Sequence, residues 1–172
     1  MDVIEDRRVR LALVLLSTLA LQKGLSSHLY VFGVAPNVLL LMTIAAGLSS
    51  TPDRGAIVGF FAGLSFDFIT QGPLGLGSLS YCLVGFAAGR LQASFVRSSQ
   101  ALPVVAGFAL TALGEGLYVV FGQVVGQVQM WTGHAWRVIL VTGTVNAVLA
   151  PLAVRIFRWA WHDEPAYRSL RY

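Results

Sequence analysis

Apolar residues fill six long stretches of this chain, and short polar stretches separate them. No stretch alternates apolar and polar residues as a barrel strand would. Several approach the roughly twenty residues that a helix needs to cross about 30 Å of hydrocarbon. The pattern predicts an all-α membrane protein with a single integral domain over 1–172, a compact bundle of about six transmembrane helices. The expected spans are 9–30, 34–50, 55–70, 74–93, 101–126 and 136–161.

The second and third stretches are short for a complete membrane crossing. Pro36 is expected in the first turn of the second helix, a position where proline is tolerated. The sequence Gln71-Gly72-Pro73 breaks the apolar pattern between the third and fourth stretches. A shorter stretch can still cross if it extends into flanking residues or if the membrane thins locally.

The composition excludes several classes of protein. The 172 residues are 56% hydrophobic and only 12% charged, about half the charged fraction of a usual soluble domain. A small domain leaves much of its surface in water, so it cannot hide this much apolar surface. A soluble enzyme and a disordered chain are therefore disfavoured. The single cysteine, Cys82, excludes an internal disulfide scaffold.

The distribution of charge predicts the topology. The chain has twelve basic and eight acidic residues. With six spans and a cytoplasmic amino terminus, Lys23 and Arg137 are the only basic residues expected on the outer side of the membrane. A five-span alternative divides the basic residues six against six, so the positive-inside rule favours six spans with both termini cytoplasmic. The basic residues form no continuous track, so no nucleic-acid partner is expected. The ten residues expected inside are Arg7, Arg8, Arg10, Arg54, Arg90, Arg97, Arg155, Arg158, Arg168 and Arg171.

Glycines recur every four residues on three of the predicted helices, including Gly122 and Gly126 on the fifth. Gly55, Gly59 and Gly63 share one face of the third helix, and Gly85 and Gly89 share one face of the fourth. In lipid, small residues let two helix backbones approach closely. These faces are expected either to pack inside the bundle or to receive a partner helix.

Two acidic residues, Asp67 and Glu115, lie inside apolar stretches. Such residues normally face protein or water and have partners. Arg137 is the nearest basic candidate, so an ion pair with either acid is one hypothesis. Asp67 capping the following turn is a second, and an ion-coupled transport site is a third. Asn146 in the sixth stretch is expected to form an interhelical hydrogen bond.

No catalytic or metal-binding motif is present in the sequence. The three histidines, His28, His134 and His162, are isolated and lack metal-ligand spacing. There is no phosphate-binding glycine loop and no nucleophile elbow. The sequence therefore predicts a protein that is not an enzyme, with no catalytic residues, no cofactor and no metal.

The region from about Val34 to Arg90 resembles the rod shape-determining protein MreD family. The matching pieces are Ala35 to Leu40, Arg54 to Asp67, Gly72 to Leu76 and Gly85 to Arg90. The glycine-rich helix that ends in aspartate, followed by Gly-Pro-Leu-Gly, is the most specific piece. The positions that match the family pattern are Pro36, Gly59, Gly63, Asp67, Gly72, Pro73, Gly75, Gly85 and Gly89.

The resemblance implies a role and a set of partners. Members are multi-pass proteins of the bacterial inner membrane that bind MreC and work with RodA, a class B penicillin-binding protein and, indirectly, MreB in lateral peptidoglycan synthesis. It implies a six-helix fold similar to vitamin-transporter substrate-binding subunits, with turns shaped by Pro36, Gly72, Pro73 and Gly75. A scaffold is thus the leading hypothesis. A vitamin-binding subunit is an alternative, with a pocket at Tyr118, Trp131, Glu115 and Asn146.

Overall fold

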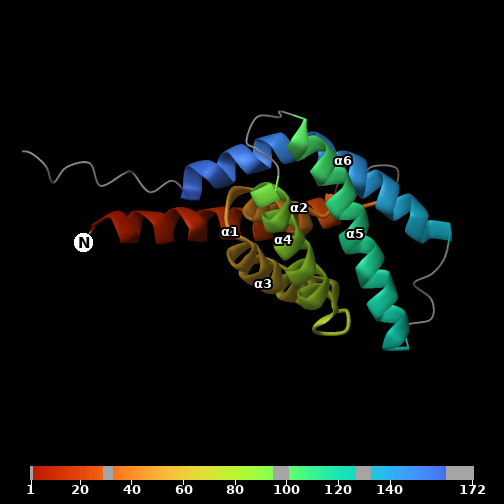
Figure 1. Ribbon diagram of the computed structural model, residues 1–172. Helices are drawn as coiled ribbons and strands as arrows, with labels where there is room; N and C mark the ends of the chain where they lie inside the picture. The colour runs from red at the N-terminus through yellow and green to blue at the C-terminus, as the bar shows by residue number, and fades with distance from the viewer. Residues whose placement is uncertain (1, 29–32, 95–100, 127–132, 162–172) are drawn as a thin grey trace, which may run out of the picture.

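Every regular element that the computed structural model describes is an α-helix (Figure 1). The described residues are 2–28, 33–94, 101–126 and 133–161. Each apolar stretch contains one helix, so the predicted all-helical fold is confirmed. The helices are α1 (Asp2–His28), α2 (Val38–Ser49), α3 (Pro52–Thr70), α4 (Leu76–Ser94), α5 (Leu102–Val124) and α6 (Gly133–Trp161).

The short helix α2 occupies the centre of the bundle and packs against each of the other five helices. Its residues 39–48 are all buried. The side chains at the heart of the core include Leu40 and Ile44 of α2, with Tyr81 and Val84 of α4. The other helices are longer and surround α2, with α5 and α6 forming one side of the molecule (Figure 1).

The start of α2 corrects one sequence prediction. Pro36 does not lie in the first helical turn, because the helix begins only at Val38. Asn37 caps the helix instead, and its side chain accepts a hydrogen bond from the amide of Leu40. Asparagine is a favoured N-cap, and proline before the cap adds no unsatisfied donor. The predicted second span is therefore a non-helical segment followed by a helix of about 18 Å.

One end of the bundle carries most of the described basic residues. The guanidinium of Arg10 in α1 lies 5.5 Å from the ring centre of Trp159 near the end of α6. The end of α4 lies against the start of α3: a Cβ added at Gly89 would contact the backbone of Pro52. Figure 1 likewise shows the start of α1 and the end of α6 on the same side. We call this side the arginine end; its described members are Arg10, Arg54, Arg90, Arg155 and Arg158.

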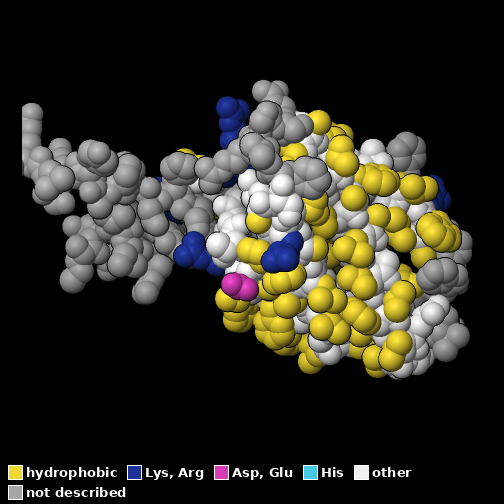
Figure 2. Space-filling view, in the orientation of Figure 1, with side chains coloured by type: hydrophobic (Ala, Val, Ile, Leu, Met, Phe, Trp, Pro, Cys, Tyr) yellow, Lys and Arg dark blue, Asp and Glu magenta, His cyan; other side chains and the backbone are white. Residues whose placement is uncertain are grey.

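The polarity of the fold is inverted relative to a soluble protein. Polar side chains such as Asp67, Thr43 and Asn146 are fully buried, whereas large apolar side chains such as Phe61 and Val148 are exposed. Hydrophobic side chains cover most of the face in Figure 2, and basic side chains cluster mainly toward one side. An apolar exterior of this extent is typical of a surface that meets lipid or other proteins.

Two described helical segments are long and apolar enough to cross a membrane by length and composition. They are Leu102–Val124 and Ala135–Ala160. Leu13–Gly24 and Val38–Ser49 are shorter apolar segments. The glycine and serine content of α3 and α4 lowers their mean hydropathy, because these residues contribute packing surface rather than apolar side chains.

Candidate functional site

The first turn of α2 lies deep inside the bundle, where its free amides cannot reach water. The first amides of any helix lack partners within the helix, and an unsatisfied amide is costly in an apolar environment. Here two side chains supply the missing acceptors. Asn37 Oδ1 accepts from the amide of Leu40 at 3.1 Å. Gln22 Oε1, from α1, accepts from the amides of Val38 at 2.7 Å and Leu39 at 3.4 Å.

Gln22 also holds the segment that leads into α2. Its Nε2 donates to the carbonyl of Pro36 at 3.3 Å, and the side chain is only 3% exposed. One amide side chain therefore bonds on both sides of Asn37. No role was predicted for Gln22, which lies within the first expected span. The signal that was available is an amide placed in an otherwise apolar stretch, but its partner could not be identified from the sequence.

Asn37 joins three further helices. Its Nδ2 donates to Tyr81 Oη of α4 at 2.6 Å and to Glu115 Oε1 of α5 at 2.9 Å. Its backbone carbonyl accepts from Asn146 Nδ2 of α6 at 3.2 Å. Asn146 Nδ2 also donates to Thr111 Oγ1 of α5 at 3.2 Å. We call this group the Asn37 cluster; its members are Gln22, Asn37, Tyr81, Thr111, Glu115 and Asn146.

The cluster brings together two of the predicted polar residues, Glu115 and Asn146. The expected interhelical hydrogen bond of Asn146 is present, to Thr111 and to the chain at Asn37. Glu115 takes the neutral amide of Asn37 as its partner, not Arg137. Arg137 is exposed near the start of α6. The ion pair proposed for Glu115 is therefore replaced by a hydrogen bond, because Asn37 enters the bundle at the depth of Glu115.

Asp67 forms a second, separate polar site at the turn between α3 and α4. It is fully buried. Its carboxylate accepts from the amide of Gly75 at 2.8 Å and from that of Gly77 at 2.9 Å. These amides lie at the start of α4, where a negative charge is favourable. The capping role predicted for Asp67 is thus observed, and an ion pair with Arg137 is not the arrangement found.

The turn between α3 and α4 uses the glycines and the proline that the sequence singled out. Gln71 ends α3 with a left-handed backbone, at φ 54°. Gly75 has φ +102°, a conformation that disfavours other residues. Gly72 packs beside the hydroxyl of Tyr118, which a Cβ at Gly72 would approach to 2.9 Å. Pro73, between them, is partly buried.

The glycine faces of α3 and α4 pack against each other along both helices. A Cβ added at Gly55 would overlap the carbonyl of Gly85. One at Gly63 would overlap that of Gly77, and one at Gly59 that of Tyr81. We call this contact the glycine seam; its described members are Gly55, Gly59, Gly63, Gly77, Gly85 and Gly89. All of them are buried, so they shape the interior and not an exposed docking face.

The remaining predicted site residues divide between described and undescribed parts. Tyr118 packs edge-on against Phe66 at 5.8 Å between ring centres and does not hydrogen-bond Glu115 or Asn146 in the described contacts. Trp131 and the side chains of His28, His134 and His162 lie outside the described residues.

The chemistry available in these two sites is that of hydrogen bonding. In the described part of the chain, no three His, Cys, Asp or Glu side chains come close enough to hold a metal ion. Asp67 accepts from amides at the start of α4, whereas Glu115 accepts from the side chain of Asn37, so the two carboxylates do not form a pair. Thr142 Oγ1, Ser78 Oγ and Asn146 Oδ1 are buried without a described partner. The arrangement suits the stabilisation of a helix that begins inside an apolar bundle.

Comparison with known proteins identifies the family. Neither the curated proteins nor the solved structures gave a match, so the predicted likeness to vitamin-transporter subunits stays a prediction. The sequence profile of the family described as rod shape-determining protein MreD matches residues 7–159. This range covers α2 to α5 entirely and most of α1 and α6. The chain therefore belongs to the MreD family of rod shape-determining membrane proteins.

Proposed function

We propose that this protein is a non-enzymatic scaffold of the rod elongation complex in the bacterial inner membrane. In this proposal it binds MreC and acts with RodA and a class B penicillin-binding protein, and indirectly with MreB, to control lateral peptidoglycan synthesis. The family match over residues 7–159 is the observation that carries the proposal. The six-helix bundle supplies the membrane-embedded body on which partners assemble.

The interior supports a scaffold because its polar groups serve the fold. Asp67 caps α4, and Glu115 bonds to Asn37. Both described pockets are apolar. One, of about 400 Å³, lies between α5 and α6, and the other, of about 200 Å³, lies between α1, α2 and α6. A vitamin site would need convergent polar groups in its pocket, and these pockets do not provide them.

We further propose that the chain crosses the membrane six times with both termini in the cytoplasm. The α1 start and the α6 end lie together at the arginine end, as an even number of crossings requires. Helices α3 and α4, of 19 residues each, are about 28 Å long, close to the hydrocarbon thickness. The positive-inside rule assigns the arginine end to the cytoplasm.

A matched pair of cysteine variants tests this topology. Cys82 is first replaced by serine. Thr51→Cys then places a thiol in the α2–α3 turn at the arginine end, and Leu74→Cys places one in the α3–α4 turn at the opposite end; both native residues are exposed. A membrane-impermeant maleimide added to intact spheroplasts should label Leu74→Cys and not Thr51→Cys. Labelling of Thr51→Cys alone would reverse the topology, and labelling of both would refute it.

Depletion and recovery experiments test the scaffold role. Depleting the protein in a rod-shaped host should make the cells round, and MreC should copurify with the tagged protein in mild detergent. Restoring wild-type protein should restore both properties. Rod-shaped growth after complete depletion would refute the role. Flux of protons or of a vitamin through liposomes that contain only this protein would favour a transporter instead.

A further inference from the structure

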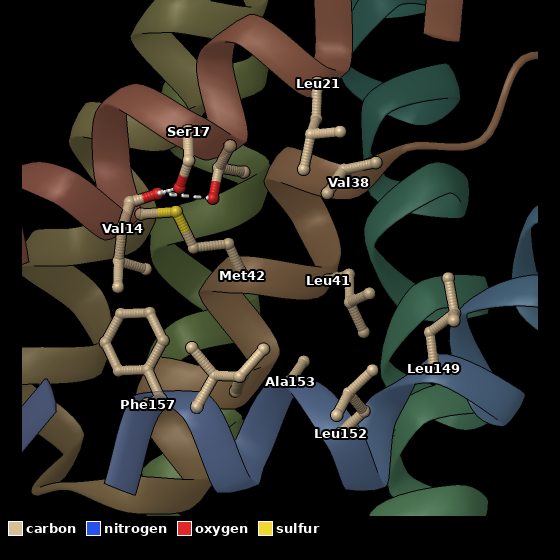
Figure 3. A pocket seen from close by; sticks show the side chains of 13 residues that line it. Val14, Ser17, Leu21, Val38, Leu41, Met42, Leu149, Leu152, Ala153 and Phe157 are labelled. Carbon is tan, nitrogen blue, oxygen red and sulfur yellow. Dashed lines mark hydrogen bonds between the residues drawn. The ribbon is translucent and has the colours of Figure 1, made fainter. Parts of the chain in front are cut away.

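A groove runs along the surface between α1, α2 and α6 (Figure 3). Its volume is about 200 Å³. Val14 of α1 and Phe157 of α6 lie at one end of it, and Leu21 and Leu149 lie toward the other. Met42 of α2 forms part of the floor. The groove thus follows the direction of α1 and α6 and does not cross them.

The walls of the groove offer almost no hydrogen-bonding capacity to a ligand. Ser17 and Thr18 carry the hydroxyls that line it. Both donate back to the carbonyl of Val14, at 3.0 Å and 2.6 Å (Figure 3). The other lining side chains are apolar. A sugar, a nucleotide or a vitamin would lose its hydrogen bonds to water there, whereas a hydrocarbon chain would lose none.

The dimensions of the groove fit a single chain. It extends over nine residues of α6, from Leu149 to Phe157, which is about 12 Å at ~1.5 Å rise per residue step. A slot of this length and about 200 Å³ accommodates part of one extended acyl chain. A complete transmembrane helix, about 10 Å across with its side chains, would not enter it.

The mouth of the groove carries positive charge. Arg10 lies one turn before Val14 on α1, and its guanidinium is 5.5 Å from the ring centre of Trp159. Trp159 is 60% exposed, as expected for an aromatic residue at the level of the headgroups. Arg155 is exposed on the adjacent part of α6. Arginine is well suited to a phosphate because it can donate two parallel hydrogen bonds.

We propose that this groove binds an anionic phospholipid, with one acyl chain between α1, α2 and α6 and the phosphate at Arg10. Arg155 adds to the positive potential at the headgroup. The site depends on the six-span arrangement proposed above, which places the arginine end at a membrane surface, but it does not depend on MreC binding. The bound lipid fills the space that the short α2 leaves beside α1 and α6.

Lipid retention tests the proposal in the full-length protein. The protein is reconstituted in vesicles of equal phosphatidylglycerol and phosphatidylcholine, extracted in mild detergent and examined by native mass spectrometry. Wild-type protein should retain one phosphatidylglycerol in preference to phosphatidylcholine. Arg10→Gln should lower that preference about five-fold, as expected for one basic residue near the surface. Arg90→Gln, which removes the same charge at the arginine end but from α4, should leave it unchanged.

A second variant tests the groove itself. Ala153→Phe places a ring between the walls and should abolish retention of both lipids. Ala109→Phe, at an exposed position of α5 outside both pockets, is the matched control. Thermal unfolding identifies a variant that fails to fold, in which case Arg10→Gln still decides. Unchanged lipid number and headgroup preference in Arg10→Gln would overturn the proposal. If Ala153→Phe retained its lipid but no longer associated with a second copy of the chain, the groove would bind that copy and not a lipid, and the proposal would be overturned. MreC recovery from separate membranes reports on the scaffold role independently.

Discussion

The α3–α4 pair and the α5–α6 pair are two antiparallel helical hairpins that pack in different ways. Along α3 and α4, glycines bring the two backbones together from Gly55 to Gly63. In α5 and α6 the close approach occurs near the arginine end, where a Cβ on Gly107 would contact Ala150. Toward their other ends the two helices diverge around the apolar pocket of about 400 Å³ (Figure 1).

The difference indicates a division of roles within the bundle. The glycine seam uses its small residues for contact between backbones, so its geometry is fixed by the main chain. The open half of α5–α6 is separated by side chains such as Leu113, Val120 and Trp136, which can change rotamer. The Asn37 cluster connects the two hairpins, because Asn37 bonds to Tyr81 of α4 and to Glu115 of α5. Four substitutions test this comparison.

The largest effect is expected at the glycine seam. Gly63→Ala places a Cβ on the carbonyl of Gly77, and a backbone carbonyl cannot rotate aside as a side chain can. We expect the free energy of unfolding in detergent, measured by SDS titration, to fall by about 3 kcal/mol. Gly24→Ala in α1 is the control, because a Cβ added there meets nothing within 4 Å. Its free energy of unfolding should not fall. A loss of stability in Gly63→Ala no larger than that in Gly24→Ala would show that the seam is not tightly packed.

The connection between the hairpins is expected to be the next most sensitive. Asn37→Leu removes the donor to Tyr81 and Glu115 and the acceptor for the amide of Leu40. The loss should be about 2–3 kcal/mol, because buried polar groups are left without partners. A double-mutant cycle with Glu115→Leu, which removes the acceptor, should give a coupling energy of about 1 kcal/mol. Additive effects would mean that Asn37 and Glu115 do not interact.

A smaller loss is expected at the turn that closes the glycine seam. Asp67→Asn keeps one acceptor for the amides of Gly75 and Gly77 but removes the charge and the second oxygen. The unfolding free energy should fall by about 1–2 kcal/mol. Asp53→Asn, an exposed aspartate in the first turn of α3, should cost only about 0.3–1 kcal/mol. Equal effects at the two positions would rule out a capping role specific to Asp67.

The smallest effect, of opposite sign, is expected in the open half of α5–α6. Gly116 lines the pocket, and a Cβ added there meets nothing within 4 Å. Gly116→Ala should therefore raise the unfolding free energy by about 0.5–1 kcal/mol through the higher helix propensity of alanine. If Gly116→Ala destabilised the protein as much as Gly63→Ala, the two hairpins would not differ in packing.

Features set by local pattern could be predicted from the sequence. The six helices follow from apolar stretches of helical length, and the spacing of four between Gly55, Gly59 and Gly63 places them on one face. The cap formed by Asp67 was one of the predicted alternatives, because Asp67 comes shortly before the Gln71-Gly72-Pro73 turn in the sequence.

Features set by contacts between distant residues could not be predicted. Asn37 meets Tyr81, Glu115 and Asn146, which are 44, 78 and 109 residues away in the chain. Nothing in the local sequence shows that α2 begins at the depth of these residues. An ion pair between Arg137 and one of the two acids was one hypothesis, because opposite charges attract, but neutral donors lie closer to both acids in the folded chain. Gln22 was missed for the same reason.

Recovery of MreC from native membranes tests the central claim most directly, which is that this bundle is a scaffold whose fixed core presents a surface to partners. Tagged wild-type protein and Gly116→Ala should each bring down MreC in mild detergent. Gly63→Ala should recover much less, because the core that positions the surface is disrupted. Wild-type protein that is folded and membrane-inserted but recovers no MreC would contradict the account.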